Sequence, residues 1–240
     1  MPENYAHKSS VEEIRQRFDA DVERFSNLET GQTATVDAPL SLELITQAAA
    51  AALPSARSVL DIGCGAGNYP LKLLQVLPGL DVALIDLSRA MLDRAVERLR
   101  PATSGRIETL QGDIRAIDLG EARFDIILAS QVFHHLRAEE EWRMVFSKCW
   151  TALNAGGAIF INDLIDHADE RVGAMMRRRW GNYLAGLRNE TYRDQVFAFN
   201  EREDTPRPLF FQMNMLKEVG FRQVDVLHKN SCFAAFYAMK

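Results

Sequence analysis

A glycine-rich turn directly after a short apolar segment is the feature that most constrains the fold of this chain. Residues 59–69 read Val-Leu-Asp-Ile-Gly-Cys-Gly-Ala-Gly-Asn-Tyr, so that Gly63, Gly65 and Gly67 occupy alternate positions. Glycine adopts positive φ angles and lets a ligand approach the backbone without a Cβ in the way. An apolar strand before such glycines and a helical pattern after them indicate the first strand-to-helix turn of a doubly wound sheet, where nucleotide-like ligands bind.

The spacing of the glycines distinguishes between classes of nucleotide. The dinucleotide pattern G-x-G-x-x-G/A needs a small residue at position 68, where this chain has Asn68, so NAD is disfavoured. A phosphate-binding loop needs Gly-Lys-Ser/Thr, which does not occur here. The sequence Asp-x-Gly-x-Gly-x-Gly resembles motif I of the class I S-adenosylmethionine (SAM)-dependent methyltransferases.

Strand and helix patterns alternate after this turn. Apolar segments predict five strands, at 58–62, 81–86, 106–110, 124–129 and 158–163, with helices at 69–77, 89–99 and 138–153 between them. Further helices are expected at 9–27, 40–53, 167–187, 190–202 and 210–218, with a polar loop at 28–39, and a final hairpin at 221–228 and 232–239. The fold predicted is α/β: a seven-stranded, mostly parallel, doubly wound Rossmann-like sheet with a C-terminal antiparallel hairpin, N-terminal helices and a helical insertion after the fifth strand.

The length and composition fit one domain. The 240 residues, 47% of them hydrophobic, suffice for one core, and we expect a single SAM-binding domain over 1–240. Residues 1–40 are predicted to form a helical lid and residues 164–209 a helical cover. The net charge of −5 argues against a nucleic-acid partner. Three scattered cysteines, an N-terminus unlike a signal peptide and the lack of a long apolar run favour the cytoplasm and no membrane insertion.

Four further segments match the methyltransferase pattern in order. Asp86, 19 residues after Gly67, ends the second strand and can accept hydrogen bonds from ribose hydroxyls, although a helix-capping role is the alternative. Gly112-Asp113-Ile114 follows the third strand, Ala129-Ser130-Gln131 the fourth, and 153–157 precede the fifth, with Ala155 in place of the usual proline. The resemblance implies that Asp61 orients the loop near the methionine amino group, and that Asp113 accepts from the adenine amino group. The cofactor contacts expected are Asp61, Gly63, Cys64, Gly65, Gly67, Asp86, Leu87, Met91, Asp113, Ile114, Ser130 and Gln131.

His134 and His135 follow the fourth strand, near the expected position of the methyl group. One of them is a candidate base for an O–H or activated C–H acceptor, because histidine titrates near neutral pH. The alternative is that both have packing roles. A metal site is not expected, because neighbouring helical residues point about 100° apart and no third ligand has H-x-x-x-H spacing.

The insertion 164–209 carries an aromatic set and an arginine run that can roof an acceptor pocket or form plain core. The set comprises Trp180, Tyr183, Tyr192, Phe197 and Phe199 with Arg177, Arg178 and Arg179. The helix containing Arg15–Asp19 and the ending 216–233 resemble the subgroup that contains the carboxy-SAM synthases. Those enzymes hold a carboxylate with an arginine of the insertion, for which Arg188 and Arg193 are candidates here.

The function expected is SAM-dependent methyl transfer to a small-molecule acceptor. Two alternatives remain open: a carboxy-SAM synthase-like reaction on SAM itself, and a non-catalytic SAM-binding partner protein. Nucleic-acid methylation is disfavoured, since neither Asn/Asp-Pro-Pro-Tyr nor a Pro-Cys pair follows the fourth strand. A homodimer is left open.

Overall fold

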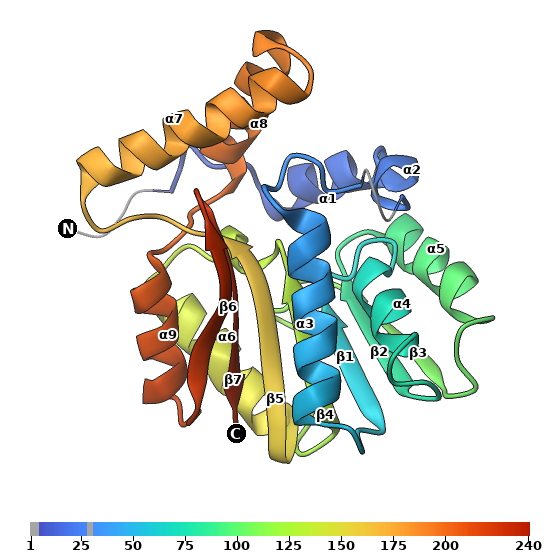
Figure 1. The fold of residues 1–240 in the computed structure, drawn as a ribbon. Coiled ribbons are helices and arrows are strands. Elements are labelled where there is room, and N and C mark those ends of the chain that lie inside the picture. Colours follow the sequence, from blue (N-terminus) through green and yellow to red (C-terminus); the bar gives the residue numbers. More distant parts are fainter. Residues whose placement is uncertain (1–4, 28–30) are drawn as a thin grey trace.

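A mixed seven-stranded sheet organises the chain in the computed structural model, which describes residues 5–27 and 31–240 (Figure 1). Residues 1–4 of the predicted lid and 28–30 of the predicted loop lie outside the described residues. The strand order is β3-β2-β1-β4-β5-β7-β6, parallel through β5 and antiparallel at β7 and β6. The bounds are β1 Ser58–Ile62, β2 Asp81–Asp86, β3 Ile107–Gln111, β4 Phe124–Ser130, β5 Leu153–Leu164, β6 Val224–Asn230 and β7 Phe233–Met239. The predicted fold class is confirmed.

Helices cover both faces of the sheet and build two cores. One face carries α3 (Ala38–Ala52), α4 (Asn68–Leu74) and α5 (Arg89–Leu99), whose apolar side chains pack on the central strands. The other face carries α6 (Glu139–Ala152) and α9 (Leu209–Glu218) (Figure 1). The central strands are buried on both sides, which explains their nearly continuous apolar sequences.

The remaining helices lie above the carboxyl ends of the parallel strands. These are α1 (Val11–Asp19), α2 (Val22–Phe25), α7 (Glu170–Leu187) and α8 (Glu190–Glu203), which Figure 1 shows over one edge of the sheet. At this edge β1 and β4 are neighbours although β2 and β3 separate them in sequence. Such a reversal of strand order opens a crevice between the two strand ends.

The largest difference from the sequence-based prediction is at β5, which begins at Leu153 rather than at 158. Other differences lie in the N-terminal helices and the last hairpin. The predicted helix 9–27 is two helices, because α1 ends at Asp19 and α2 begins after Asp21. Acidic residues at the negative end of a helix dipole oppose its continuation. Pro39, expected in a loop, lies in the first turn of α3, where its missing N–H costs nothing. The strand expected from 221 begins at Val224.

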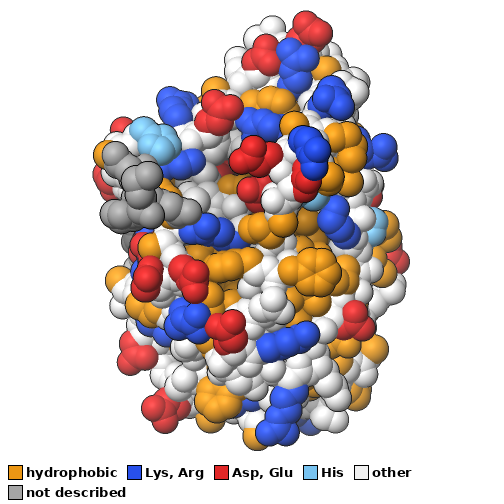
Figure 2. Space-filling view, turned by 90° about the vertical axis from the view of Figure 1, so that its left-hand side faces the viewer, with side chains coloured by type: hydrophobic (Ala, Val, Ile, Leu, Met, Phe, Trp, Pro, Cys, Tyr) orange, Lys and Arg blue, Asp and Glu red, His pale blue; other side chains and the backbone are white. Residues whose placement is uncertain are grey.

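The molecular surface and the helix lengths add two observations. On the face shown in Figure 2, acidic and basic side chains are interspersed and apolar side chains gather near the middle. In the part of the chain that the structure describes, the helices are too short or too polar to cross a bilayer.

Candidate cofactor and acceptor site

The glycine loop between β1 and α4 forms one wall of the crevice. Its three glycines have φ angles of +65° (Gly63), +50° (Gly65) and +79° (Gly67), which disfavour any side chain. A Cβ at Gly65 would meet nothing within 4 Å, so the backbone there faces open space. A Cβ at Gly63 would lie 2.7 Å from Val132 on the β4 side of the crevice. The loop therefore combines an exposed backbone with a close approach to its neighbour.

Gly67 lies at the start of α4, and a Cβ there would lie 3.2 Å from Ala95 of α5, so this glycine lets the two helices approach each other closely. It is not among the residues that line the first cavity. The cofactor contact of Gly67 stays a prediction.

Asp86 connects the loop to the end of β2. Its carboxylate accepts hydrogen bonds from the backbone N–H groups of Gly65 (2.8 Å) and Ser88 (2.9 Å). Burial raises the pKa of Asp86 to about 6, although these hydrogen bonds favour the ionised form. Each carboxylate oxygen thus accepts one backbone hydrogen bond, and the side chain borders the crevice.

Asp61, in β1, is a second acidic residue of the crevice. It is 1% exposed, and its Oδ1 has no hydrogen-bond partner. Burial, reinforced by the nearby Asp86, raises the pKa of Asp61 well above its usual range. A buried carboxylate oxygen without a partner is costly. A cationic ligand group, such as the methionine ammonium of SAM, would satisfy this oxygen.

Two adjoining cavities follow the crevice. The first, of about 100 Å³, is lined by nine of the predicted cofactor residues, which are Asp61, Gly63, Cys64, Gly65, Asp86, Leu87, Met91, Ser130 and Gln131. The second, of about 60 Å³, contains the predicted adenine-side residues Asp113 and Ile114 and shares Asp86 and Leu87 with the first. The twelve predicted contacts thus converge, except for Gly67.

Asp113 is already engaged by a basic side chain. Arg115 donates to both carboxylate oxygens of Asp113, at 2.5 Å and 3.0 Å, and also reaches Glu141. Burial would raise the pKa of Asp113, but the hydrogen bonds from Arg115 outweigh burial and lower it. The carboxylate stays ionised, so any adenine amino group would share it with Arg115.

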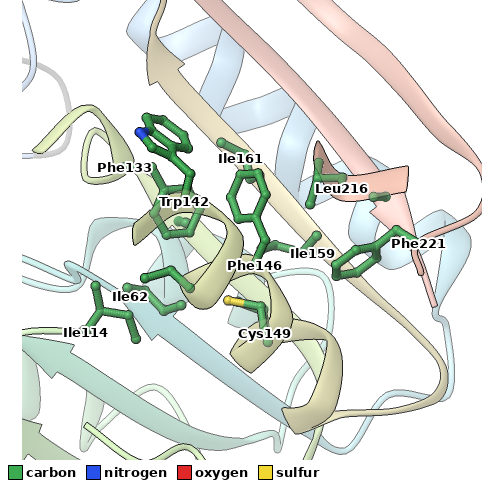
Figure 3. Packing of buried hydrophobic residues seen from close by; sticks show 14 of the residues in the cluster. Ile62, Ile114, Phe133, Trp142, Phe146, Cys149, Ile159, Ile161, Leu216 and Phe221 are labelled. Atoms are coloured by element: carbon green, nitrogen blue, oxygen red, sulfur yellow. The ribbon is translucent and has the colours of Figure 1, made fainter. Parts of the chain in front are cut away.

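The histidine pair occupies a short 3₁₀ turn, η1 (Phe133–His135), after β4. The turn is fixed from below because Phe133 is buried and packs on Trp142 and Phe146 of α6, with ring centroids 6.4 Å and 5.4 Å apart. Figure 3 shows these aromatic rings together in the core beneath the turn. The turn that carries the two histidines is therefore anchored to the core through Phe133.

The two histidines have opposite electrostatic environments. His134 is buried, which lowers its pKa, but hydrogen bonding to Asp163 of β5 and the charge of Asp204 outweigh burial and raise the pKa to about 9. For His135, burial and the neighbouring His134 outweigh the charge of Asp204 and lower the pKa to about 4. The surroundings thus favour the protonated form of His134 and the neutral form of His135.

A third and larger cavity, of about 380 Å³, lies beneath the α7–α8 insertion. It shares five residues with the first cavity, which are Phe18, Phe25, Gln32, Gln131 and His135. Of the predicted aromatic cover, Trp180, Tyr192 and Phe199 line it, whereas Phe197 packs against Trp180 with ring centroids 5.2 Å apart. Tyr183 borders a separate surface hollow. The walls of the third cavity are mixed: aromatic side chains lie among charged ones, which include Arg17, Arg24, Arg188, Glu203 and Asp204.

Several residues at or near the site were not predicted as site residues. Asp163, which contacts His134, lies one residue before the end of β5 and is the second of two polar residues in an apolar strand, a pattern visible in the sequence. Asp204, by contrast, follows α8 and reaches the histidines through the tertiary fold alone. Phe18, Phe25 and Gln32 come from the N-terminal segment, where only helix periodicity was visible.

Comparison with known proteins defines the class. Residues 59–157 match the family described as methyltransferase domain. Residues 59–157 are thus similar to a methyltransferase domain, and the sheet order is that of the class I SAM-dependent methyltransferase fold, a class of enzymes whose cofactor is SAM.

Three individual proteins illustrate what the chain is similar to. Over 189 residues the chain is 29% identical to a carboxy-S-adenosyl-L-methionine synthase of Chromohalobacter salexigens, across 76% of this chain and 68% of that protein. The [4+2]-cyclase SpnF has a similar fold (TM-score 0.66, 11% identity, 97% of both chains). Human N-acetylserotonin methyltransferase in complex with SAM gives a TM-score of 0.60 at 18% identity, covering 96% of this chain and 56% of the human one. The predicted family resemblance, enzyme class and cofactor are confirmed.

Proposed function

We propose that the protein transfers the methyl group of SAM to a small-molecule acceptor bound in the third cavity. The observation that carries this proposal is the junction of the first and third cavities, which share Gln131 and His135 as lining residues. A ligand of the glycine loop and a second ligand beneath α7 and α8 would meet there. The shared residues are two aromatic side chains, Phe18 and Phe25, and three polar ones, Gln32, Gln131 and His135, which suits an acceptor with both an apolar part and a polar group.

Each part of the crevice has a proposed role in holding the cofactor. Asp61 would neutralise the methionine ammonium, Asp86 would accept from the ribose hydroxyls, and the backbone at Gly65 would lie against the methionine part. When bound, SAM supplies an electrophilic methyl group on a sulfonium. The protein's contribution is then to orient the acceptor in line with that methyl group and to exclude water.

The histidine pair is proposed to act on the acceptor rather than on the cofactor. His135 lines all three cavities, and His134 lines the third. A polar hydrogen-bonding group beside the acceptor can orient it and assist loss of its proton. The Discussion gives the kinetic test of this role.

The function is tested with the protein as purified. Native mass spectrometry of the copurifying ligand separates SAM, S-adenosylhomocysteine, carboxy-SAM and NAD by mass. Incubation with methyl-labelled SAM and a metabolite library then identifies a labelled acceptor. Recovery of NAD as the bound ligand would overturn the proposal. If SAM binds but label never moves, the non-catalytic partner role is favoured.

A carboxy-SAM synthase-like reaction is the second candidate, favoured by one arginine. Arg188 lines the third cavity and stacks over Tyr192, with its guanidinium carbon 4.7 Å from the ring centroid. In the described part of the chain, no carboxylate lies within ion-pair distance of Arg188. Arg193, the other predicted candidate, pairs with Asp194 (2.8 Å) and is not a lining residue. Carboxy-SAM as the copurifying ligand would favour this reaction.

The predicted acceptor class, cellular compartment and oligomeric state are part of the same proposal. A small-molecule acceptor, rather than nucleic acid, fits an enclosed cavity beneath helices. Cys64, Cys149 and Cys232 are free and buried, in keeping with the reducing cytoplasm proposed from the sequence. A homodimer stays a prediction, and sedimentation of the purified protein tests it.

A further inference from the structure

Three metal-binding side chains converge at one corner of the third cavity. Oδ1 of Asp204 lies 3.2 Å from Nδ1 of His135 and 3.6 Å from Nε2 of His134. One ligand atom from each of the three residues lies within 4.8 Å of the other two. Metal–ligand bonds of about 2.0–2.2 Å place neighbouring ligand atoms about 3.0–3.5 Å apart. The three side chains are therefore close to the spacing that a single ion requires.

Asp163, which is not one of the three candidate ligands, orients the ring of His134. Its Nδ1 is hydrogen-bonded to the Asp163 carboxylate, which also accepts from the backbone N–H groups of His134 (3.1 Å) and Leu164 (2.7 Å). A carboxylate in that position holds the Nδ1 proton and directs Nε2 toward Asp204, so that an ion bound there would displace the Nε2 proton that His134 carries in the ion-free protein. Histidines that bind metals in proteins are commonly held in this way.

Asp204 has an orienting partner of its own. Its Oδ2 accepts a hydrogen bond from Nδ2 of Asn200 (2.8 Å), so that Oδ1 remains for the two histidines. The backbone joins the same segments, because the N–H of Thr205 donates to the carbonyl of His134 (2.6 Å). Two ligands on a rigid turn and one at the end of α8 are thus held in a fixed relation before any ion binds.

We propose that His134, His135 and Asp204 bind one divalent first-row transition ion, with Zn²⁺ as the best match, at the wall of the acceptor cavity. Two imidazoles and one carboxylate suit Zn²⁺ or Fe²⁺ and leave coordination positions open. All three residues line the third cavity, so an open position faces the space for the acceptor. An oxygen or nitrogen donor of the acceptor would occupy it.

This inference goes beyond the proposed methyl transfer, since the sulfonium chemistry itself needs no ion. It also departs from the sequence-based expectation of no metal site. That expectation considered ligands close to the histidines in sequence, whereas Asp204 lies 69 residues after His135. With an ion bound, both histidines are ligands, and they act on the acceptor through the ion.

The test is a titration of the full-length protein with Co²⁺ after removal of metals with a chelator. We expect one equivalent of Co²⁺ to bind with the visible absorption of a four- or five-coordinate site, and Zn²⁺ to displace it while Mg²⁺ does not. Asp204→Asn should weaken Co²⁺ binding about 100-fold or more. Asp163→Asn, which removes only the orienting carboxylate, should weaken it about 10–100-fold.

The matched control is His228→Gln. His228 pairs with Asp37 at 2.9 Å and lines none of the three cavities, so this variant should bind Co²⁺ like the unmodified protein. Thermal unfolding without metal shows whether each variant is folded. Added Zn²⁺ should raise the melting temperature of the unmodified protein but not that of Asp204→Asn. Absence of saturable binding to the unmodified protein overturns the proposal, as does unchanged affinity in folded Asp204→Asn. Because these readouts do not use turnover, they can fail while methyl transfer holds, and the reverse.

Discussion

Arg17 of α1 forms a two-pronged ion pair with Glu203 at the end of α8, with Nε–Oε1 at 2.8 Å and Nη2–Oε2 at 2.5 Å. The Glu203 side chain is only 6% exposed, so this contact links the N-terminal helices to the insertion inside the roof of the acceptor cavity. Two further hydrogen bonds tie α7 to the N-terminal segment, from Trp180 to the carbonyl of Ala34 (2.8 Å) and from Tyr183 to that of Thr33 (2.9 Å).

Arg17→Met should loosen this roof. A buried carboxylate without its partner is strongly unfavourable, so the helices should separate locally. We expect amide hydrogen exchange in α1 and α8 of this variant to become about tenfold faster or more. In the unmodified protein, binding of SAM and acceptor should slow exchange in the same helices. Arg15→Met is the control, because Arg15 pairs with Glu12 and Asp19 within α1. Equal exchange in both variants would mean that the ion pair does not hold the roof.

Asp86→Ala should weaken SAM binding by about 2–4 kcal/mol, because ribose hydroxyls lose a charged acceptor. Calorimetric titration with SAM and with S-adenosylhomocysteine measures this change. The variant should stay folded, since Asp86 stands at a strand end. Unchanged affinity in a folded variant would contradict the ribose assignment.

The raised pKa of Asp86 predicts a pH dependence with opposite signs for binding and stability. The carboxylate must be ionised to accept from two hydroxyls, so SAM affinity should fall as the pH drops below about 6. In the cofactor-free protein the folded state holds the Asp86 proton up to about pH 6, whereas the unfolded chain releases it near 3.8. This group therefore costs stability as the pH rises between those values.

Binding and unfolding series across this pH range check both signs, with Asp86→Asn as reference. In that variant the residual SAM affinity should be weak and should lack the Asp86-dependent change below pH 6. A variant that keeps the full pH dependence would show that another group titrates.

Gly65→Val should abolish SAM binding. The backbone at Gly65 has a φ of +50° and faces open space, so a branched side chain would strain the turn and fill the ligand position. Gly186→Ala in α7 is the control, since a Cβ there meets nothing within 4 Å and its φ is not in the left-handed region. Normal SAM binding by folded Gly65→Val would remove the glycine loop from the site.

His135→Gln should leave SAM affinity within a few-fold and lower turnover about 10²- to 10⁴-fold, because the residue acts on the acceptor. His134→Gln should also lose turnover, together with stability, since it leaves the buried Asp163 without its partner. Single-turnover rates per folded molecule separate the two effects. If neither variant slows transfer, the pair has a packing role.

Local sequence patterns predicted that the candidate cofactor residues gather at one edge of the sheet. The Asp61–Gly67 loop, Asp86 and Asp113 each belong to a short motif next to a strand, and parallel strands bring such ends to one edge by geometry. The close packing of Gly67 against α5 was not predictable from the motif. The acceptor half depends on contacts such as Arg17–Glu203 and His135–Asp204, which join residues 186 and 69 positions apart. No local periodicity encodes such pairs.

The boundaries of the matched domain have an evolutionary consequence. Residues 59–157 include every predicted cofactor contact and the histidine pair, whereas Asp163, Asp204 and most of the third cavity come from outside them. The candidate cofactor residues and the cavity proposed for the acceptor thus lie mostly in separate stretches of the sequence. Exchange or drift of the segment 164–209 can change what is modified while the donor site stays intact, so proteins that share this core can be expected to diverge in substrate faster than in cofactor.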